Sequence, residues 1–277
     1  GYGWTGPYAK RPGIDPLAQA LMGLERAQGG PDNPPVFPAQ LAPTDITTGA
    51  MGALGTILAL FVRGRSGIGQ RVESDLLGGG IVLSSAWFTR HAGRAERPLA
   101  DKEQHGLGPF HRLYRLRDGW VYVVAESDEA RRAMCAIAGF TTPDPAALQP
   151  AKGRHPNTTP FALELAAVIA RRSLGETLAA LKAAGVPCSE VPAAAAEIFL
   201  DDPHATANDM VAVRRHAKAG ELRVAWRLVR FADTHDSAGL PTPLLGEHTD
   251  QVLREIGCGE GEIRSLHAEG VVKTEVA

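Results

Sequence analysis

The segment 46–62 constrains the fold of this chain more than any other stretch. It carries no charged residue, and small residues recur along it: Gly49, Ala50, Gly52, Ala53 and Gly55. Glycine and alanine let a second backbone approach closely, although each glycine lowers the helix propensity of the segment. The sequence therefore predicts a buried helix that packs tightly against another element.

Downstream of this helix the sequence predicts a mixture of strands and helices. A short strand is expected at 70–75, followed by a helix at 76–90. The run 113–124 predicts a β-hairpin, because Asp118 and Gly119 stand between two β-prone stretches. Apolar periodicity and helix stop signals predict further helices at 129–138, 160–171, 174–184, 247–257 and 260–269. We therefore assign the chain to the α/β class.

Two changes in this pattern divide the chain into three segments. Residues 1–91 are expected to form the first part of a large domain. Residues 92–195 hold a linker and a small α+β domain, and residues 196–277 return to the large domain. A length of 277 residues fits such an arrangement of one large domain with a smaller inserted one.

Composition limits the partners that the protein is expected to have. Lys and Arg number 29 and Asp and Glu number 31, so the formal net charge is −2 and no strong field collects nucleic acid. The longest apolar run, 57–62, ends at Arg63, well short of a membrane span. We therefore expect a soluble protein with no nucleic-acid or membrane partner.

The cysteines and the first residues indicate the compartment. Cys135, Cys188 and Cys258 are odd in number and form no CxxC pair, which argues against a disulfide framework and against a structural zinc site. The chain begins without a charged region followed by an apolar stretch, so no secretory signal is visible. The sequence predicts a cytoplasmic protein without a bound metal.

Asp45 is the carboxylate to which the pattern draws most attention, because it directly precedes the small-residue helix. One interpretation is an N-cap, which aspartate often provides and which contributes about 1 kcal/mol. The other is a nucleophile at a cramped helix start, where backbone N–H groups and the helix dipole stabilise an oxyanion during acyl transfer. Spacing alone favours the cap, and the two roles compete for the same oxygens.

The chain resembles the class III coenzyme A transferases, a family typified by formyl-CoA transferase and the carnitine CoA-transferases. The resemblance spans nearly the whole sequence and is carried by separate segments in the family's order: 1–20, 43–49, 63–70, 114–120, 202–205 and 243–249. It implies the family fold, here an incomplete Rossmann-like large domain with an inserted smaller α+β domain. The chain is similar to the C-terminal two-thirds of a family member.

The resemblance also implies an activity, with Asp45 as the catalytic residue. In the family the matching aspartate attacks an acyl-CoA thioester and forms a mixed anhydride, then an aspartyl-CoA thioester, from which CoA passes to a second carboxylic acid. Covalent catalysis of this kind needs no metal. The implied partners are acyl-CoA, a carboxylic acid and a second copy of the chain in an interlocked homodimer. CoA thioester is a substrate, and no cofactor is bound permanently.

Two further groups of residues take roles from the resemblance. A segment near the start of the chain matches positions that contact CoA, namely Arg11, Pro12, Gly13 and Ile14. Gly106 and Gly108 resemble a glycine-containing loop that covers the acyl intermediate in some members. The plainer alternatives are an exposed loop arginine and an ordinary turn.

Two other functions remain open beside CoA transfer. The related 2-methylacyl-CoA racemases place a histidine directly before the aspartate that matches Asp15, whereas this chain has Ile14. Racemisation normally needs two bases on opposite faces of the substrate carbon, and Asp45 supplies one. The second alternative is a non-catalytic fragment or partner subunit of a transferase, which the missing N-terminal part of the family pattern favours.

Overall fold

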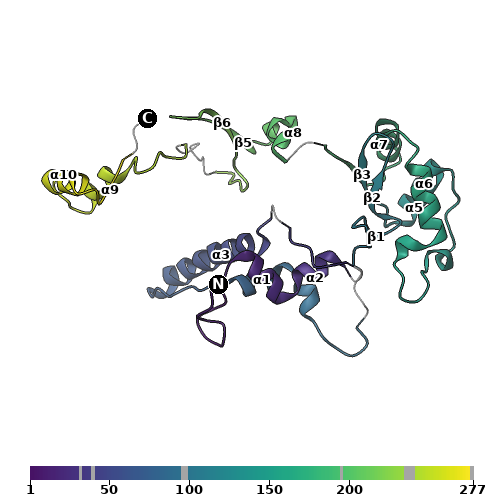
Figure 1. The fold of residues 1–277 in the computed structure, drawn as a ribbon, viewed down its shortest axis with the longest axis horizontal. Helices are drawn as coiled ribbons and strands as arrows, with labels where there is room; N and C mark the ends of the chain where they lie inside the picture. Colours follow the sequence, from purple (N-terminus) through teal and green to yellow (C-terminus); the bar gives the residue numbers. More distant parts are fainter. Residues whose placement is uncertain (31–32, 39–40, 95–98, 194–195, 234–240, 275–277) are drawn as a thin grey trace. The chain divides into compact units, whose positions relative to one another are not determined.

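The structure is a computed structural model that describes the chain except for residues 31–32, 39–40, 95–98, 194–195, 234–240 and 275–277 (Figure 1). The described chain divides into two compact units, Gly1–Pro192 and Ala193–Ala277. The three-segment division itself remains a prediction.

The first unit opens with helices that pack on one another. They are α1 (Asp15–Met22), α2 (Leu24–Gly29), α3 (Pro43–Ser66), α4 (Leu76–Leu83) and the 3-10 helix η1 (Ser85–Phe88). Gly23 separates α1 from α2 with a left-handed backbone, φ 76°. Asp75 caps α4, since its carboxylate accepts the N–H of Gly78 at 2.9 Å. Helix α4 packs on both α1 and α3.

The rest of the first unit is a four-stranded antiparallel sheet with helices on one side (Figure 1). The strands, in the order β1-β2-β3-β4, are β1 (Gly106–Gly108), β2 (His111–Arg115), β3 (Trp120–Val124) and β4 (Cys188–Val191). The helices are α5 (Asp128–Ala138), α6 (Pro160–Ile169) and α7 (Leu174–Ala183), with 3-10 helices η2 (Pro145–Leu148) and η3 (Pro156–Thr158). These elements confirm the hairpin and the three helices predicted after it.

The core of this unit lies between the sheet and its helices. Alternate residues of β2 and β3 point into it, because successive side chains of a strand face opposite sides. Tyr114, Val121 and Val123 are at most 1 % exposed and pack with Met134 of α5 and Leu165 of α6. Strand β1 lies at one edge of this sheet.

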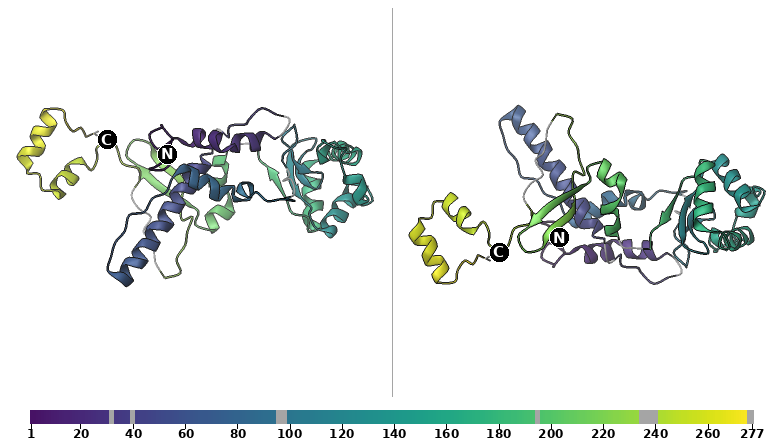
Figure 2. Two further views of the ribbon diagram at one scale, coloured as in Figure 1. Left: turned by 90° about the horizontal axis from the view of Figure 1, so that it is seen from below. Right: turned by 90° about the horizontal axis from the view of Figure 1, so that it is seen from above.

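The second unit carries a two-stranded sheet and short helices (Figure 2). Its elements are η4 (Ala196–Asp201), α8 (Pro203–Ala207), β5 (Val211–His216), β6 (Gly220–Ala225), α9 (Thr249–Glu255) and α10 (Glu260–Ala268). His216 pairs with Gly220 at the hairpin end, where Gly220 has φ 75°. The two terminal helices confirm the sequence prediction for this part of the chain.

Three sequence predictions about the first unit are wrong. Helix α3 forms and is longer than expected, but its apolar side chains are exposed rather than buried, Ile57 to 63 % and Phe61 to 61 %. Residues 70–75 form no strand, and the helix expected at 76–90 ends at Leu83. The sequence pattern shows that a helix is apolar. It does not show whether another element packs against that apolar surface and buries it.

The expectation that no segment approaches a membrane span also needs correction. Helix α3 is long and apolar enough to cross a membrane by length and composition, and it is the one such helix among the described residues. Counting uninterrupted apolar residues missed it, because glycine and threonine interrupt its apolar sequence. Core helices of soluble proteins can also be this long and this apolar.

Candidate functional site

Asp45 lies in the first turn of α3, two residues after the helix begins at Pro43. The N-cap position belongs to Ala42, whose side chain caps nothing, so the N-cap interpretation of Asp45 is wrong. The Asp45 side chain is exposed, and its carboxylate makes no hydrogen bond or ion pair within the part of the chain that the structure describes. The positive end of the helix dipole favours its negative charge.

A second carboxylate takes the capping role. Asp15, the first residue of α1, is 4 % exposed and reaches the start of α3. Its Oδ1 accepts the N–H of Thr44 at 2.8 Å, the hydroxyl of Thr44 at 2.5 Å and the N–H of Asp45 at 3.3 Å. Its Oδ2 accepts the side-chain amide of Gln19 at 2.5 Å. Asp15 therefore caps α3 from another helix.

This arrangement changes the expected stabilisation of an oxyanion. The N–H groups of Thr44 and Asp45 donate to Asp15, and the N–H of Ile46 donates to the Ala42 carbonyl at 3.0 Å. The amides of the first turn of α3 are thus already occupied. Oxyanion donors for chemistry at Asp45 must come from outside this turn, contrary to the sequence expectation.

Burial and hydrogen bonding act in opposite directions on the pKa of Asp15. Burial raises it, while the Thr44 and Gln19 side chains and the amides of Thr44 and Asp45 lower it. Hydrogen bonds to the ionised form prevail, and the pKa lies below its ordinary value. Asp15 is therefore ionised at neutral pH, and its carboxylate contacts the backbone amide of Asp45.

Close packing at this site comes from α4 rather than from the small residues of α3. A Cβ placed on Gly79 would lie 2.2 Å from Thr48 Oγ1 and 2.9 Å from the Thr44 carbonyl oxygen. A Cβ on Gly49 would meet nothing within 4 Å. The glycines of α4 let the two helices approach at the end of α3 that carries Asp45.

The residues expected to contact CoA lie just before α1. Arg11 is exposed, and its guanidinium lies 4.3 Å from the ring centroid of Tyr8. Ile14 is 60 % exposed at the N-cap of α1. Pro12 is exposed as well, whereas Gly13 lies against the backbone of Gly1, so closely that a Cβ on Gly13 would stand 2.7 Å from Gly1 Cα. The segment joins directly to the buried Asp15.

Gly106 and Gly108 lie in β1, the edge strand of the sheet. Gly106 pairs with Arg112 and has φ 154°, and a Cβ there would stand 2.5 Å from the His111 carbonyl oxygen. Leu107, between the two glycines, lines a cavity of about 420 Å³ together with Gln19 and Pro43. The structure thus brings the glycine strand and the start of α3 to one cavity.

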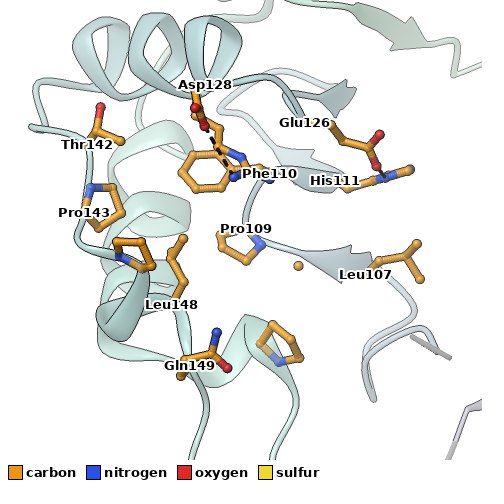
Figure 3. A pocket seen from close by; sticks show the side chains of 14 residues that line it. Leu107, Pro109, Phe110, His111, Glu126, Asp128, Thr142, Pro143, Leu148 and Gln149 are labelled. Atoms are coloured by element: carbon orange, nitrogen blue, oxygen red, sulfur yellow. Dashed lines mark hydrogen bonds and ion pairs between the residues drawn. The ribbon is translucent and has the colours of Figure 1, made fainter. Parts of the chain in front are cut away.

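A second cavity, of about 640 Å³, lies beside the sheet (Figure 3). Of the site residues predicted from the sequence, Gly108 alone lines it. Its walls are mainly apolar, with Phe110 and Leu148 among them. His111 Nδ1 lies 2.8 Å from Glu126 Oε1, and Arg131 lies 3.9 Å from Asp128 (Figure 3). The four charged or titratable groups at this cavity therefore pair among themselves.

One cluster among the described residues has the geometry to hold a metal ion, formed by Asp101, Glu103 and His105. Asp101 is 4 % exposed, and its oxygens accept the N–H of His105 at 2.5 Å, the N–H of Gly106 at 3.1 Å and the Asn157 amide at 2.9 Å. These bonds make Asp101 an anchor for the turn before β1. Three neutral donors already satisfy the carboxylate without a cation.

Sequence reasoning missed Asp15, Gln19 and Thr44 as parts of the site. Thirty residues separate Asp15 from the amide of Asp45, and nothing in the spacing of the two indicates that they meet. The available signal was an aspartate directly before Pro16, an arrangement that alone indicates only a helix start.

Comparisons with known proteins identify relatives of this chain. A family model described as CoA-transferase family III matches residues 1–249. An acyl-CoA transferase of Fusarium pseudograminearum is 30 % identical over 98 % of this chain and 60 % of that protein. Succinyl-CoA:mesaconate CoA-transferase of Haloarcula marismortui is 30 % identical over 92 % of this chain and 63 % of that protein.

The solved structures show the same fold. A CAIB/BAIF family protein from Brucella suis superposes with a TM-score of 0.71 at 22 % identity, covering 92 % of this chain and 66 % of that one. The chain spans about 60 % of the length of the curated relatives that it matches. Because the family model matches residues 1–249, the chain belongs to CoA-transferase family III.

Proposed function

We propose that the protein is an acyl-CoA:carboxylate CoA-transferase in which Asp45 is the nucleophile. The observation that carries this proposal is the exposed carboxylate of Asp45, without a hydrogen-bond partner among the described residues, at the capped start of α3. Relatives that act on succinyl-CoA support the reaction class. Succinyl-CoA is therefore the first donor to test.

Each step of the proposed reaction exchanges one acyl bond for another. A carboxylate oxygen of Asp45 attacks the thioester carbon, the C–S bond breaks, and CoA leaves as the thiolate with a mixed anhydride on Asp45. The thiolate then attacks the aspartyl carbonyl and releases the donor acid. The acceptor carboxylate attacks the aspartyl-CoA thioester, its C–S bond breaks, and a second mixed anhydride forms as the CoA thiolate leaves. The thiolate finally attacks the acceptor's acyl carbon, which gives the acceptor's CoA thioester and restores the Asp45 carboxylate. No net proton is transferred.

The remaining features of the proposal concern substrate contacts and assembly. Arg11, Pro12, Gly13 and Ile14 contact CoA, with Arg11 as a planar donor to phosphate. Gly106 and Gly108 lie over the acyl intermediate, supported by the cavity that Leu107 shares with Pro43. The working protein is an interlocked homodimer that acts in the cytoplasm and needs no metal or permanently bound cofactor. Its large domain is Rossmann-like.

The test uses this chain and a version extended to the length of its relatives. Each is incubated with succinyl-CoA and hydroxylamine, and the intact mass is read. We expect the extended protein to gain an aspartyl hydroxamate at Asp45, because hydroxylamine intercepts the anhydride and the thioester. Asp45→Ala should abolish the modification while lowering the melting temperature only slightly, since the side chain is exposed and loses only its interaction with the helix dipole.

The alternatives give different results. If neither chain is modified although both fold and bind CoA, Asp45 is not a nucleophile and the protein is a non-catalytic partner or a racemase. Exchange of the hydrogen next to the thioester carbonyl of a 2-methylacyl-CoA would then identify the racemase. Modification of the extended protein alone would show that the shorter chain is an incomplete enzyme.

A further inference from the structure

Asp15 ties the backbone of the proposed nucleophile to a different helix. Its Oδ1 receives three donors from two consecutive residues of α3, namely both the amide and the hydroxyl of Thr44 and the amide of Asp45. Gln19, one turn along α1, holds the other oxygen. All of these partners except Asp45 are at most 4 % exposed, so water does not compete with them.

Other helices of the chain are capped differently. Ser127, Thr159 and Ser173 cap α5, α6 and α7 with their own side chains from the N-cap position. Helix α3 has Ala42 at this position and depends on a carboxylate 29 residues upstream of Thr44. A local cap would satisfy the helix end equally well. Because Asp15 belongs to α1, its cap also links α1 to α3 at the backbone of Asp45.

Packing makes this link rigid. Thr44 is fully buried, and its methyl group lies where α4 approaches at Gly80. The Thr48 hydroxyl, one turn later, donates to the Asp75 carbonyl at 3.0 Å. The first turn of α3 is thus held from α1 on one side and from the start of α4 on another, while the Asp45 side chain stays exposed.

We propose that Asp15 is a positioning residue for catalysis, which fixes the backbone of Asp45 so that its free carboxylate stands at the correct distance from the thioester carbon. This inference rests on the proposed function of Asp45. Displacement of a reacting group by about 1 Å costs up to roughly 100-fold in rate, so a cap that removes backbone freedom acts on the chemical step. Asp15 itself does not touch the substrate.

The experiment compares variants of the transferase extended to the length of its relatives, with acyl transfer and hydroxamate formation at Asp45 as readouts. Thr44→Val keeps the shape of the buried side chain but removes the hydroxyl donor, and Thr44→Ser retains that donor. Asp15→Asn removes the charge. The matched control is Asp202→Asn, which removes a capping carboxylate from α8, where Asp202 accepts the N–H of His204 at 2.7 Å.

We expect Asp15→Asn to lower kcat by about 10- to 100-fold, with KM for acyl-CoA changed by less than about threefold, because the reacting geometry rather than binding is altered. Thr44→Val should lower kcat in the same way to a smaller extent, and Thr44→Ser should restore it. Asp202→Asn should leave kcat unchanged. The measurements are made at a temperature at which thermal melting shows every variant folded.

Two results separate this inference from the proposed function. If Asp45→Ala abolishes transfer but folded Asp15→Asn and Thr44→Val keep the wild-type kcat, Asp15 is only a structural cap and the inference is wrong. If Asp45→Ala keeps full activity, the nucleophile is elsewhere and both proposals fail. Should Asp15→Asn not fold, the comparison of Thr44→Val with Thr44→Ser decides the question.

Discussion

At the scale of single residues, two carboxylates at one helix start have opposite surroundings. Asp15 is buried and accepts four hydrogen bonds, whereas the Asp45 carboxylate is exposed and accepts none from the described residues. A carboxylate whose oxygens are all engaged is a poor nucleophile, and one without partners is available for attack. The sequence offered capping and nucleophilic attack as competing roles for Asp45, and the structure gives the capping role to Asp15.

The lowered pKa of Asp15 predicts a pH-dependent contribution to stability. Because its pKa in the folded protein lies below its value in the unfolded chain, the ionised carboxylate stabilises the fold at pH values above about 4. This contribution is lost as the pH falls through the folded-state pKa. We expect the melting temperature of Asp15→Asn to lie below wild type at pH 7 and the difference to close under acidic conditions. A difference in melting temperature that stays constant from pH 7 to acidic pH would contradict this account.

Gly106 gives a second prediction at this scale. Its backbone has φ 154°, and a Cβ would stand 2.5 Å from the His111 carbonyl oxygen, so Gly106→Ala should destabilise the unit by about 1–3 kcal/mol. Gly108→Ala is the control, because there a Cβ meets only Pro156 Cβ at an ordinary 3.6 Å. Urea unfolding of both variants measures the difference. Equal stability of the two would show that β1 has another backbone conformation.

At the scale of elements, the crossing of α3 and α4 decides where Asp45 stands. The contact is made by Gly79, whose missing side chain leaves room for Thr48 and the Thr44 carbonyl. Helix α3 carries its own small residues elsewhere, and Gly49 faces open space among the described residues. The small residues of α3 on which the sequence prediction rested are not at this contact, although Gly55 stands close to Val72, where a Cβ would lie 2.8 Å from Cγ1.

This crossing predicts opposite effects for two neighbouring glycines of α4. Gly79→Ala should lower the melting temperature and the rate of hydroxamate formation at Asp45, because a Cβ would overlap Thr48 Oγ1 and push the helices apart. Gly78→Ala should be neutral or stabilising by about 0.5–1 kcal/mol, since its Cβ would meet only Asp75 at 3.8 Å or more and alanine favours the helix. Thermal melts and trapping assays on both variants provide the test.

At the scale of the whole molecule, the outer part of α3 has a large apolar surface. Leu54, Ile57, Leu58 and Phe61 are each at least 50 % exposed. Soluble proteins rarely leave contiguous apolar surface of this kind uncovered, and such surface marks a contact with protein or membrane. The proposed interlocked homodimer accounts for it as a protein contact.

Substitution on this surface should change assembly without unfolding the chain. Ile57→Glu and Phe61→Glu together are expected to reduce the association of the extended protein in sedimentation velocity, while the circular dichroism spectrum stays that of the wild type. Arg71→Glu is a control on an exposed side chain beyond the helix, and it should not change association. Binding of the wild type to lipid vesicles, without any change in association for the double variant, would instead assign α3 to a membrane.

The sequence by itself determined the family, the long helix, the central hairpin and the helices after it, because these depend on local periodicity, turn residues and motifs read in order. It also singled out Asp45. Only the tertiary structure decided that Asp45 is not a cap, since the capping oxygen belongs to Asp15 on another helix. It likewise decided that α3 is exposed and that α4 supplies the close contact, because burial and helix crossing depend on which distant segments meet.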